Sequence, residues 1–163
     1  MHITVRGAGT EDASAILRPG DSMPEFKLFT LLEAERTLPL VRRIVADLTL
    51  EYPAWRAAVG RFEVLTGGAR ADWGETEELV GARDEVTRHA NRINQFLQEL
   101  EAIGCVFKGF EAGLVDFYSL REDRPVFLCW RLGEDRINHW HEIDTGFSGR
   151  QPIDGSILSA IQS

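Results

Sequence analysis

Residues 104–143 read GCVFKGFEAGLVDFYSLREDRPVFLCWRLGEDRINHWHEI. Runs rich in β-branched and aromatic residues alternate here with short turn-forming segments. The runs are CVFKGF, GLVDFYSL, RPVFLCWRL and INHWHEI, and the turns fall at residues 111–113, 120–124 and 133–135. Short runs of this kind, separated by so few residues, are typical of strands joined by hairpins. We therefore predict an antiparallel meander of three or four strands.

A long amphipathic helix is predicted upstream of this stretch, beginning in FTLLEAERTLPLVRRIV (residues 29–45). Thr30 and Glu33 have the spacing of a capping box, in which each side chain bonds the other residue's backbone N–H. Apolar residues then recur every three or four positions, which is typical of a helix with one buried face. Pro39 should kink this helix or begin a second one, and Pro53 should bend it again. The glycines at 67–68 should end it.

A second helix is predicted from about Thr76 to Ile103, with glutamates near its start and Gly104 at its end. Two long amphipathic helices joined by a short loop form an antiparallel hairpin. Helices followed by strands along the chain favour an α+β fold. The predicted fold is therefore a long antiparallel helix hairpin packed on a three- or four-stranded antiparallel β-meander.

The chain is expected to divide into an N-terminal arm and one domain. Residues 1–27 mix Gly, Ser, Pro and acidic residues with no sustained period. We expect an arm or loop there, with a composition that permits mobility. Residues 28–163 are expected to form a single α+β domain, which ends in a short helix capped by Ser156.

The composition excludes several classes of protein. The chain has 163 residues and a formal net charge of −8. An acidic chain lacks the excess of Lys and Arg with which proteins bind nucleic acid or an anionic membrane. No apolar run is long enough for a transmembrane helix, and no signal peptide is visible. Cys105 and Cys129 lack CxxC spacing and should pack as small apolar residues, which favours a soluble cytoplasmic protein.

Both faces of the strand predicted at PVFLCWRL (residues 125–132) are largely apolar. A strand with one exposed face should alternate apolar and polar residues instead. The second face of the sheet should therefore be covered by the N-terminal arm, by the C-terminal segment or by a second subunit. The last of these alternatives makes a homodimer one expectation.

The run HWHE (residues 139–142) has a pattern that occurs in metal sites. On a strand His139 and His141 point to the same face, where two imidazoles can converge on a divalent metal. Asp116 or Asp144 would have to supply a further ligand. The alternative is that His139 lies at the edge of a strand and His141 is a hydrogen-bonded core residue.

Asp116 lies among large apolar residues in the run LVDF. A buried carboxylate needs partners, and Arg131 and Arg150 are the candidates. The carboxylate would then form a structural ion pair, or it would act as an acid or base together with His141. Glu142, which follows His141, completes the set of candidate catalytic residues.

The loop GFSGR (residues 146–150) contains Gly146 and Gly149 and ends in Arg150. These glycines permit a close approach of the backbone to a ligand, and the guanidinium could bind a carboxylate or phosphate as a fork. The alternative is a tight connection whose arginine bonds a backbone carbonyl or Asp116, since the P-loop pattern GxxxxGK[ST] is absent. The candidate ligand-binding residues are Arg150, Arg131, Trp140 and Lys108.

Several of these runs together carry a resemblance to a known family. They are GLVDF (113–117), CWRLGE (129–134), WHE (140–142), GFSGRQPI (146–153) and the helix entry FTLLEAERTLPLVRRI (29–44). From about residue 28 to about residue 153 the chain resembles an uncharacterised, mostly bacterial family, domain of unknown function 2203. The resemblance implies no activity. The family usually has an acidic residue where Gly109 follows Lys108, and His139 is less characteristic of it than Trp140, His141 and Glu142.

Two functions fit these observations. The first is binding of a small anionic ligand or a divalent metal through a His/Asp/Arg cluster on the C-terminal meander, with catalysis as an extension. The second is that of a noncatalytic interaction module whose helix hairpin or second sheet face binds another protein. The first predicts that the polar residues converge in one pocket. The second predicts separate ion pairs and an exposed apolar patch.

Overall fold

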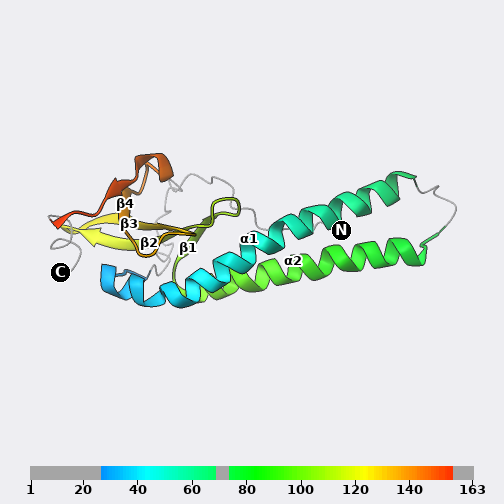
Figure 1. Ribbon diagram of the computed structural model, residues 1–163, viewed down its shortest axis with the longest axis horizontal. Coiled ribbons are helices and arrows are strands. Elements are labelled where there is room, and N and C mark those ends of the chain that lie inside the picture. Colours follow the sequence, from blue (N-terminus) through cyan, green and yellow to red (C-terminus); the bar gives the residue numbers. More distant parts are fainter. Residues whose placement is uncertain (1–26, 69–73, 156–163) are drawn as a thin grey trace, which may run out of the picture.

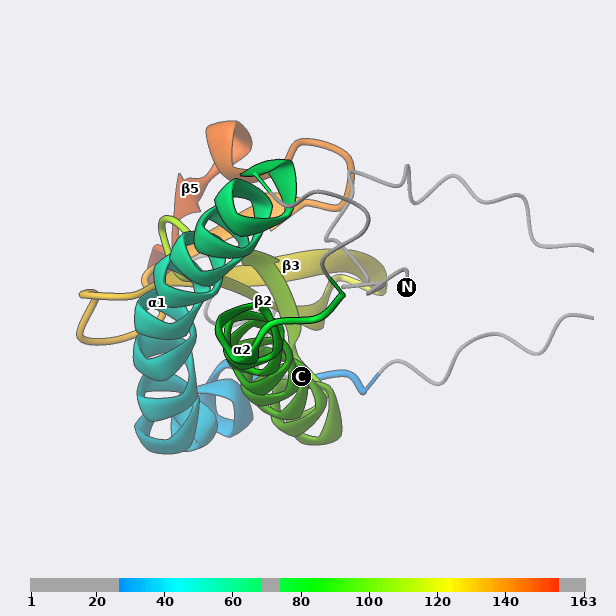
Figure 2. The same ribbon diagram turned by 90° about the vertical axis from the view of Figure 1, so that its right-hand side faces the viewer.

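A computed structural model describes residues 27–68 and 74–155. Residues 1–26 of the expected arm and the expected helix from Ser156 lie outside the described residues. Two long helices, α1 and α2, run side by side, and the sheet lies at one end of this hairpin (Figure 1). The view turned by 90° shows the two helices beside each other, with strands β2 and β3 behind them (Figure 2). The α+β prediction is therefore confirmed.

Helix α1 spans Leu31–Gly68 and begins with the predicted capping box. The Glu33 backbone N–H donates to Thr30 Oγ1 at 3.2 Å, and the Thr30 N–H donates to Glu33 Oε2 at 3.1 Å. Pro39 and Pro53 both lie inside this single helix, so neither proline starts a new one. Each proline removes one backbone hydrogen bond, and the apolar stripe on both sides of it keeps the helix packed.

Helix α2 spans Glu77–Ile103 and has a side-chain cap at one end and a glycine cap at the other. Thr76 Oγ1 accepts a hydrogen bond from the Leu79 N–H at 3.2 Å. Gly104 has a φ of 101° and donates its N–H to the carbonyls of Leu100 and Glu101. Only glycine adopts this left-handed conformation without strain, which is why the helix ends at the predicted residue.

The sheet is antiparallel and has five strands in sequence order, rather than the three or four predicted. They are β1 (Val106–Gly109), β2 (Leu114–Arg121), β3 (Arg124–Arg131), β4 (His139–Glu142) and β5 (Gln151–Pro152). Glu122 and Asp123 both have positive φ and form the tight turn between β2 and β3. The extra strand arises because the 3-10 turn η1 (Phe147–Gly149) brings the chain back along β4.

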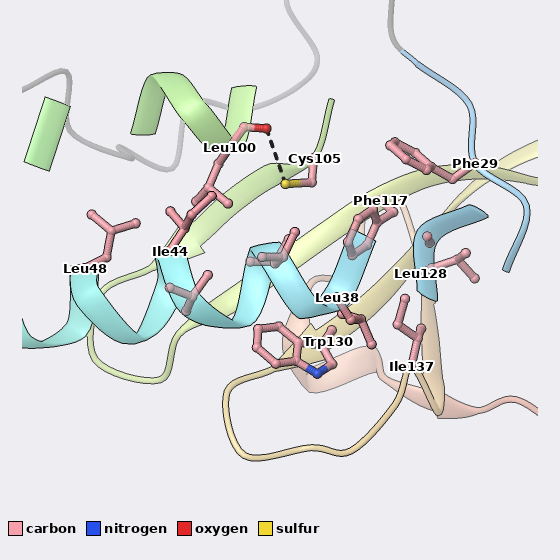
Figure 3. Packing of buried hydrophobic residues seen from close by; sticks show 14 of the residues in the cluster. Phe29, Leu38, Ile44, Leu48, Leu100, Cys105, Phe117, Leu128, Trp130 and Ile137 are labelled. Carbon is pink, nitrogen blue, oxygen red and sulfur yellow. Dashed lines mark hydrogen bonds between the residues drawn. The ribbon is translucent and has the colours of Figure 1, made fainter. Parts of the chain in front are cut away.

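The two faces of the sheet have different surroundings. Val126, Leu128 and Trp130 of β3 belong to the main hydrophobic core, together with Leu38 and other residues of α1 (Figure 3). The opposite face carries Phe127 and Cys129, which are also buried. The prediction that the second face is not open to solvent is thus confirmed, and the homodimer stays a prediction.

Gly113, in the turn immediately before β2, is a position where the fold requires glycine. Its φ is 63°, and an added Cβ would lie 2.8 Å from Leu132 Cβ and 2.9 Å from Val45 Cγ1. We expect Gly113→Ala to lower the free energy of unfolding by about 2 kcal/mol, because alanine adds both backbone strain and a clash. Urea denaturation measures the change. Gly81→Ala, in open space on α2, should instead be neutral or stabilising, and equal losses at both positions would contradict the requirement for glycine at 113.

Candidate metal-binding site

Asp116, Cys129 and His141 are brought together on the second face of the sheet. Register pairs Asp116 of β2 with Cys129 of β3, and Phe127 of β3 with His141 of β4. Alternate residues of a strand share a face, so side chains from these three neighbouring strands project on the same side. All three are buried, and one potential ligand atom from each lies within 4.8 Å of the other two. This cluster is the candidate site.

His141 is held at both ring nitrogens. Nε2 lies 3.1 Å from Asp116 Oδ2, and Nδ1 lies 2.7 Å from the backbone carbonyl oxygen of Glu142. A carbonyl oxygen can only accept, so Nδ1 carries a proton and Nε2 is the nitrogen presented to the cluster. Burial, the largest single influence, lowers the pKa of His141, but the hydrogen bond and charge of Asp116 and the hydrogen bond to the Glu142 carbonyl together outweigh it. The net result is a pKa above the usual 6.5.

Asp116 has a second cationic neighbour in Lys108, whose Nζ lies 4.0 Å from Oδ2. Lys108 lies where the register between β1 and β2 shifts, which marks a β-bulge. Bulges change the direction in which a side chain points. The ammonium of Lys108 also lies 4.8 Å from the centre of the Phe127 ring. Asp116 Oδ1 is buried and has no hydrogen-bond partner among the described residues.

Cys129 is the member of the cluster that was not expected from the sequence. Burial raises the pKa of its thiol to about 12, and the charge of Asp116 adds to this effect. Without a metal the thiol is therefore neutral at physiological pH, which agrees with the prediction that Cys129 packs as a small apolar residue. Its place beside Asp116 follows from the two-residue turn at Glu122 and Asp123, which sets the β2–β3 register. That turn was the signal available in the sequence.

Arg150 pairs with Glu134 rather than with Asp116. Its guanidinium donates to both carboxylate oxygens of Glu134 at 2.8 Å and to the Cys129 carbonyl at 3.4 Å. The interpretation in which this arginine bonds a backbone carbonyl is therefore the one that the contacts support. The same guanidinium lies 5.0 Å from the ring centre of Phe147. Arg150 thus contacts the backbone of one cluster residue, Cys129, and the carboxylate of Glu134 neutralises its positive charge.

The other predicted site residues lie outside the cluster. His139 Nδ1 is 3.7 Å from Glu134 Oε1. The cluster contains His141 but not His139. Glu142 pairs with Arg124 at 2.8 Å.

Trp140 is buried in the main core, on the face opposite the cluster. Arg131 is exposed, with its guanidinium 6.0 Å from the Phe147 ring centre. Of the predicted catalytic residues, Asp116 and His141 are in contact and Glu142 lies apart from them.

The molecule is thus an α+β protein with a buried carboxylate, thiol and imidazole that could hold a metal ion. The chain belongs to the family described as "Uncharacterized conserved protein (DUF2203)", whose model matches residues 27–153. This match confirms the resemblance seen in the sequence, and the cluster lies inside the matched range. Searches of curated proteins and of solved structures found no match. Among the described residues, no helix meets the length and apolarity that a membrane span needs.

Proposed function

We propose that the protein binds a divalent transition-metal ion, with Zn²⁺ as the best fit, through Asp116, Cys129 and His141. One observation carries the proposal: three buried ligand atoms of different kinds, from three adjacent strands, lie within 4.8 Å of one another. A carboxylate oxygen, a thiolate sulfur and an imidazole nitrogen are the ligands that Zn²⁺ prefers. Ligands held on strands of one sheet are also positioned more rigidly than ligands on loops.

The contacts of His141 support this proposal. Metal-bound histidines usually donate their second ring N–H to a carbonyl or carboxylate, which fixes the tautomer and the orientation of the ring. The 2.7 Å contact from Nδ1 to the Glu142 carbonyl supplies that bond. Nε2 is left facing Asp116 and can exchange its proton for a metal ion.

Metal binding at this site must release protons. The Cys129 thiol, with its pKa near 12, and His141 Nε2 both have to lose a proton before they can bind a cation. A bound metal would favour the thiolate, because a cation lowers the pKa of a thiol that coordinates it. We therefore expect the affinity for Zn²⁺ to rise as the pH rises from about 6 to about 8.

The test is metal binding by protein purified without an affinity tag. We expect one Zn²⁺ or Co²⁺ per chain, and the Co²⁺ form should show near-ultraviolet absorption from a thiolate–cobalt bond. Cys129→Ser should weaken binding at least about 100-fold and remove that absorption, because it replaces the proposed sulfur ligand. Metal content by mass spectrometry and calorimetric titration measure the effect.

Cys105→Ser is the matched control. Cys105 is also buried, and burial also raises its pKa to about 12, but its thiol donates to the Leu100 carbonyl at the end of α2. This variant should bind metal as the wild type does. Failure of the wild type to bind either metal would refute the proposal, as would equal losses in the two serine variants.

A protein-interaction role is the second candidate. Leu50 and Val64 of α1 have exposed fractions of 74% and 75%, which are high for large apolar side chains. Separate ion pairs, which this role predicts, occur at Arg124–Glu142 and Arg150–Glu134. The role would be supported if Leu50→Glu abolished co-purification of a partner that the wild type retains, and a monomeric wild type without a partner would count against it.

A further inference from the structure

Lys108 differs from the three proposed ligands in its exposure. Its side chain has an exposed fraction of 42%, whereas those of Asp116 and His141 have 4% and 3%. The bulge in β1 directs this lysine toward the cluster, and its ammonium lies 4.0 Å from Asp116 Oδ2. A small molecule approaching these residues from solvent would therefore meet a positive charge.

Metal binding would neutralise the cluster itself and leave the positive charge of Lys108 without a counterion. The carboxylate of Asp116 and the thiolate of Cys129 together neutralise a divalent cation, and His141 is neutral when it is a ligand. Lys108 would then lose Asp116 as its counterion, because the metal takes that carboxylate. Arg150 does not alter this balance, since Glu134 pairs with it at 2.8 Å. One uncompensated positive charge would remain beside the metal.

Three protein ligands would also leave a bound zinc ion with one ligand fewer than the four that it prefers. Structural zinc sites have four protein ligands, whereas sites with three keep a position for water or for a bound molecule. Among the described residues, the cluster of potential metal ligands consists of Asp116, Cys129 and His141, and no fourth His, Cys, Asp or Glu belongs to it. A fourth ligand would therefore come from solution.

From these features we propose that the metal-loaded site takes a small monoanion, of the class of a monocarboxylate, with Lys108 as its counterion. This inference rests on the proposed metal site. One carboxylate oxygen would fill the open metal position, and the ammonium of Lys108 would neutralise the remaining charge. The lysine is suited to this role because its ammonium lies over the Phe127 ring and its flexible chain can move from Asp116 to a ligand.

Acetate binding to the Co²⁺-loaded full-length chain tests this inference. The visible bands of Co²⁺ respond to a change of ligand, so acetate titration should shift them with saturation. We expect Lys108→Met to weaken acetate binding by about fivefold to tenfold while Co²⁺ still binds, because one partly exposed charge is removed. Lys27→Met is the matched control, since the Lys27 ammonium lies over the Phe29 ring instead, and it should leave acetate binding unchanged.

The outcomes separate this inference from the metal site itself. If Co²⁺ does not bind to the wild type, the metal proposal fails and the anion site fails with it. If Co²⁺ binds but acetate leaves its spectrum unchanged, the metal site stands and the anion site is overturned. The anion site is also overturned if Lys108→Met and Lys27→Met bind acetate equally well.

Discussion

Replacing Trp130 by alanine is expected to lower the free energy of unfolding by about 3–5 kcal/mol, the largest stability change that we predict for one residue. Trp130 has an exposed fraction of 0% and lies in the main core, beside Leu38 and Ile137 in Figure 3. Its indole N–H donates to the Glu134 carbonyl at 3.0 Å. The alanine variant would lose the packing of α1 on β3 and would leave that carbonyl without its donor.

The effect can be measured by urea denaturation, followed by far-ultraviolet circular dichroism. If the alanine variant does not fold, Trp130→Phe can be measured instead. It removes the hydrogen bond and only part of the side-chain volume, and it should lower the free energy of unfolding by about 1–2 kcal/mol. Trp55→Phe is the control, since the Trp55 indole nitrogen has no hydrogen-bond partner among the described residues. A loss at Trp55 as large as that at Trp130 would contradict the expected role of Trp130.

Local sequence signals were sufficient to predict the helices. Thr30 with Glu33, Thr76 and Gly104 each act within one helical turn, so the sequence near each residue contains the reason why the helix begins or ends there. The four longer strands follow equally from runs of β-branched and aromatic residues. The fifth strand could not be predicted in this way. Gln151–Pro152 is too short to show alternation, and it pairs with β4 only because η1 turns the chain.

The candidate site was harder to predict, because it depends on contacts between strands. Asp116 and His141 were expected to meet, and they do. The neighbour of Asp116 on β3 depends on which two residues form the β2–β3 turn. A shift of one residue would have placed Cys129 on the opposite face of the sheet. Arg150 was one of two candidate partners of Asp116, with a backbone carbonyl as the alternative, and it pairs instead with Glu134 and the Cys129 carbonyl.

Replacing Asp116 by asparagine is expected to lower the pKa of His141 in the metal-free protein, because the carboxylate bonds this imidazole and attracts its positive charge. Burial, the largest single influence on this imidazole, favours the neutral form, and Asp116 is the main group that acts against it in the wild type, together with the Glu142 carbonyl. Without the carboxylate, only the hydrogen bond to the Glu142 carbonyl would still favour the charged form, against burial and the charge of Lys108. Titration of the His141 Cε1–H resonance measures the shift. Asp47→Asn, on the exposed face of α1, is the control and should leave it unchanged.

The same substitution should reduce the contribution of His141 to stability at low pH. In the wild type the pKa of His141 is raised, so its contribution to stability is present below about pH 6.5 and is lost as the pH rises through the folded-state value. In Asp116→Asn the pKa would be lower than in the wild type, so less of this contribution would be present at low pH. The difference in unfolding free energy between the two proteins should therefore be larger at about pH 5.5 than at about pH 8.5. A difference that does not vary with pH would show that Asp116 does not hold the proton on Nε2, the proton that a metal ion would have to displace.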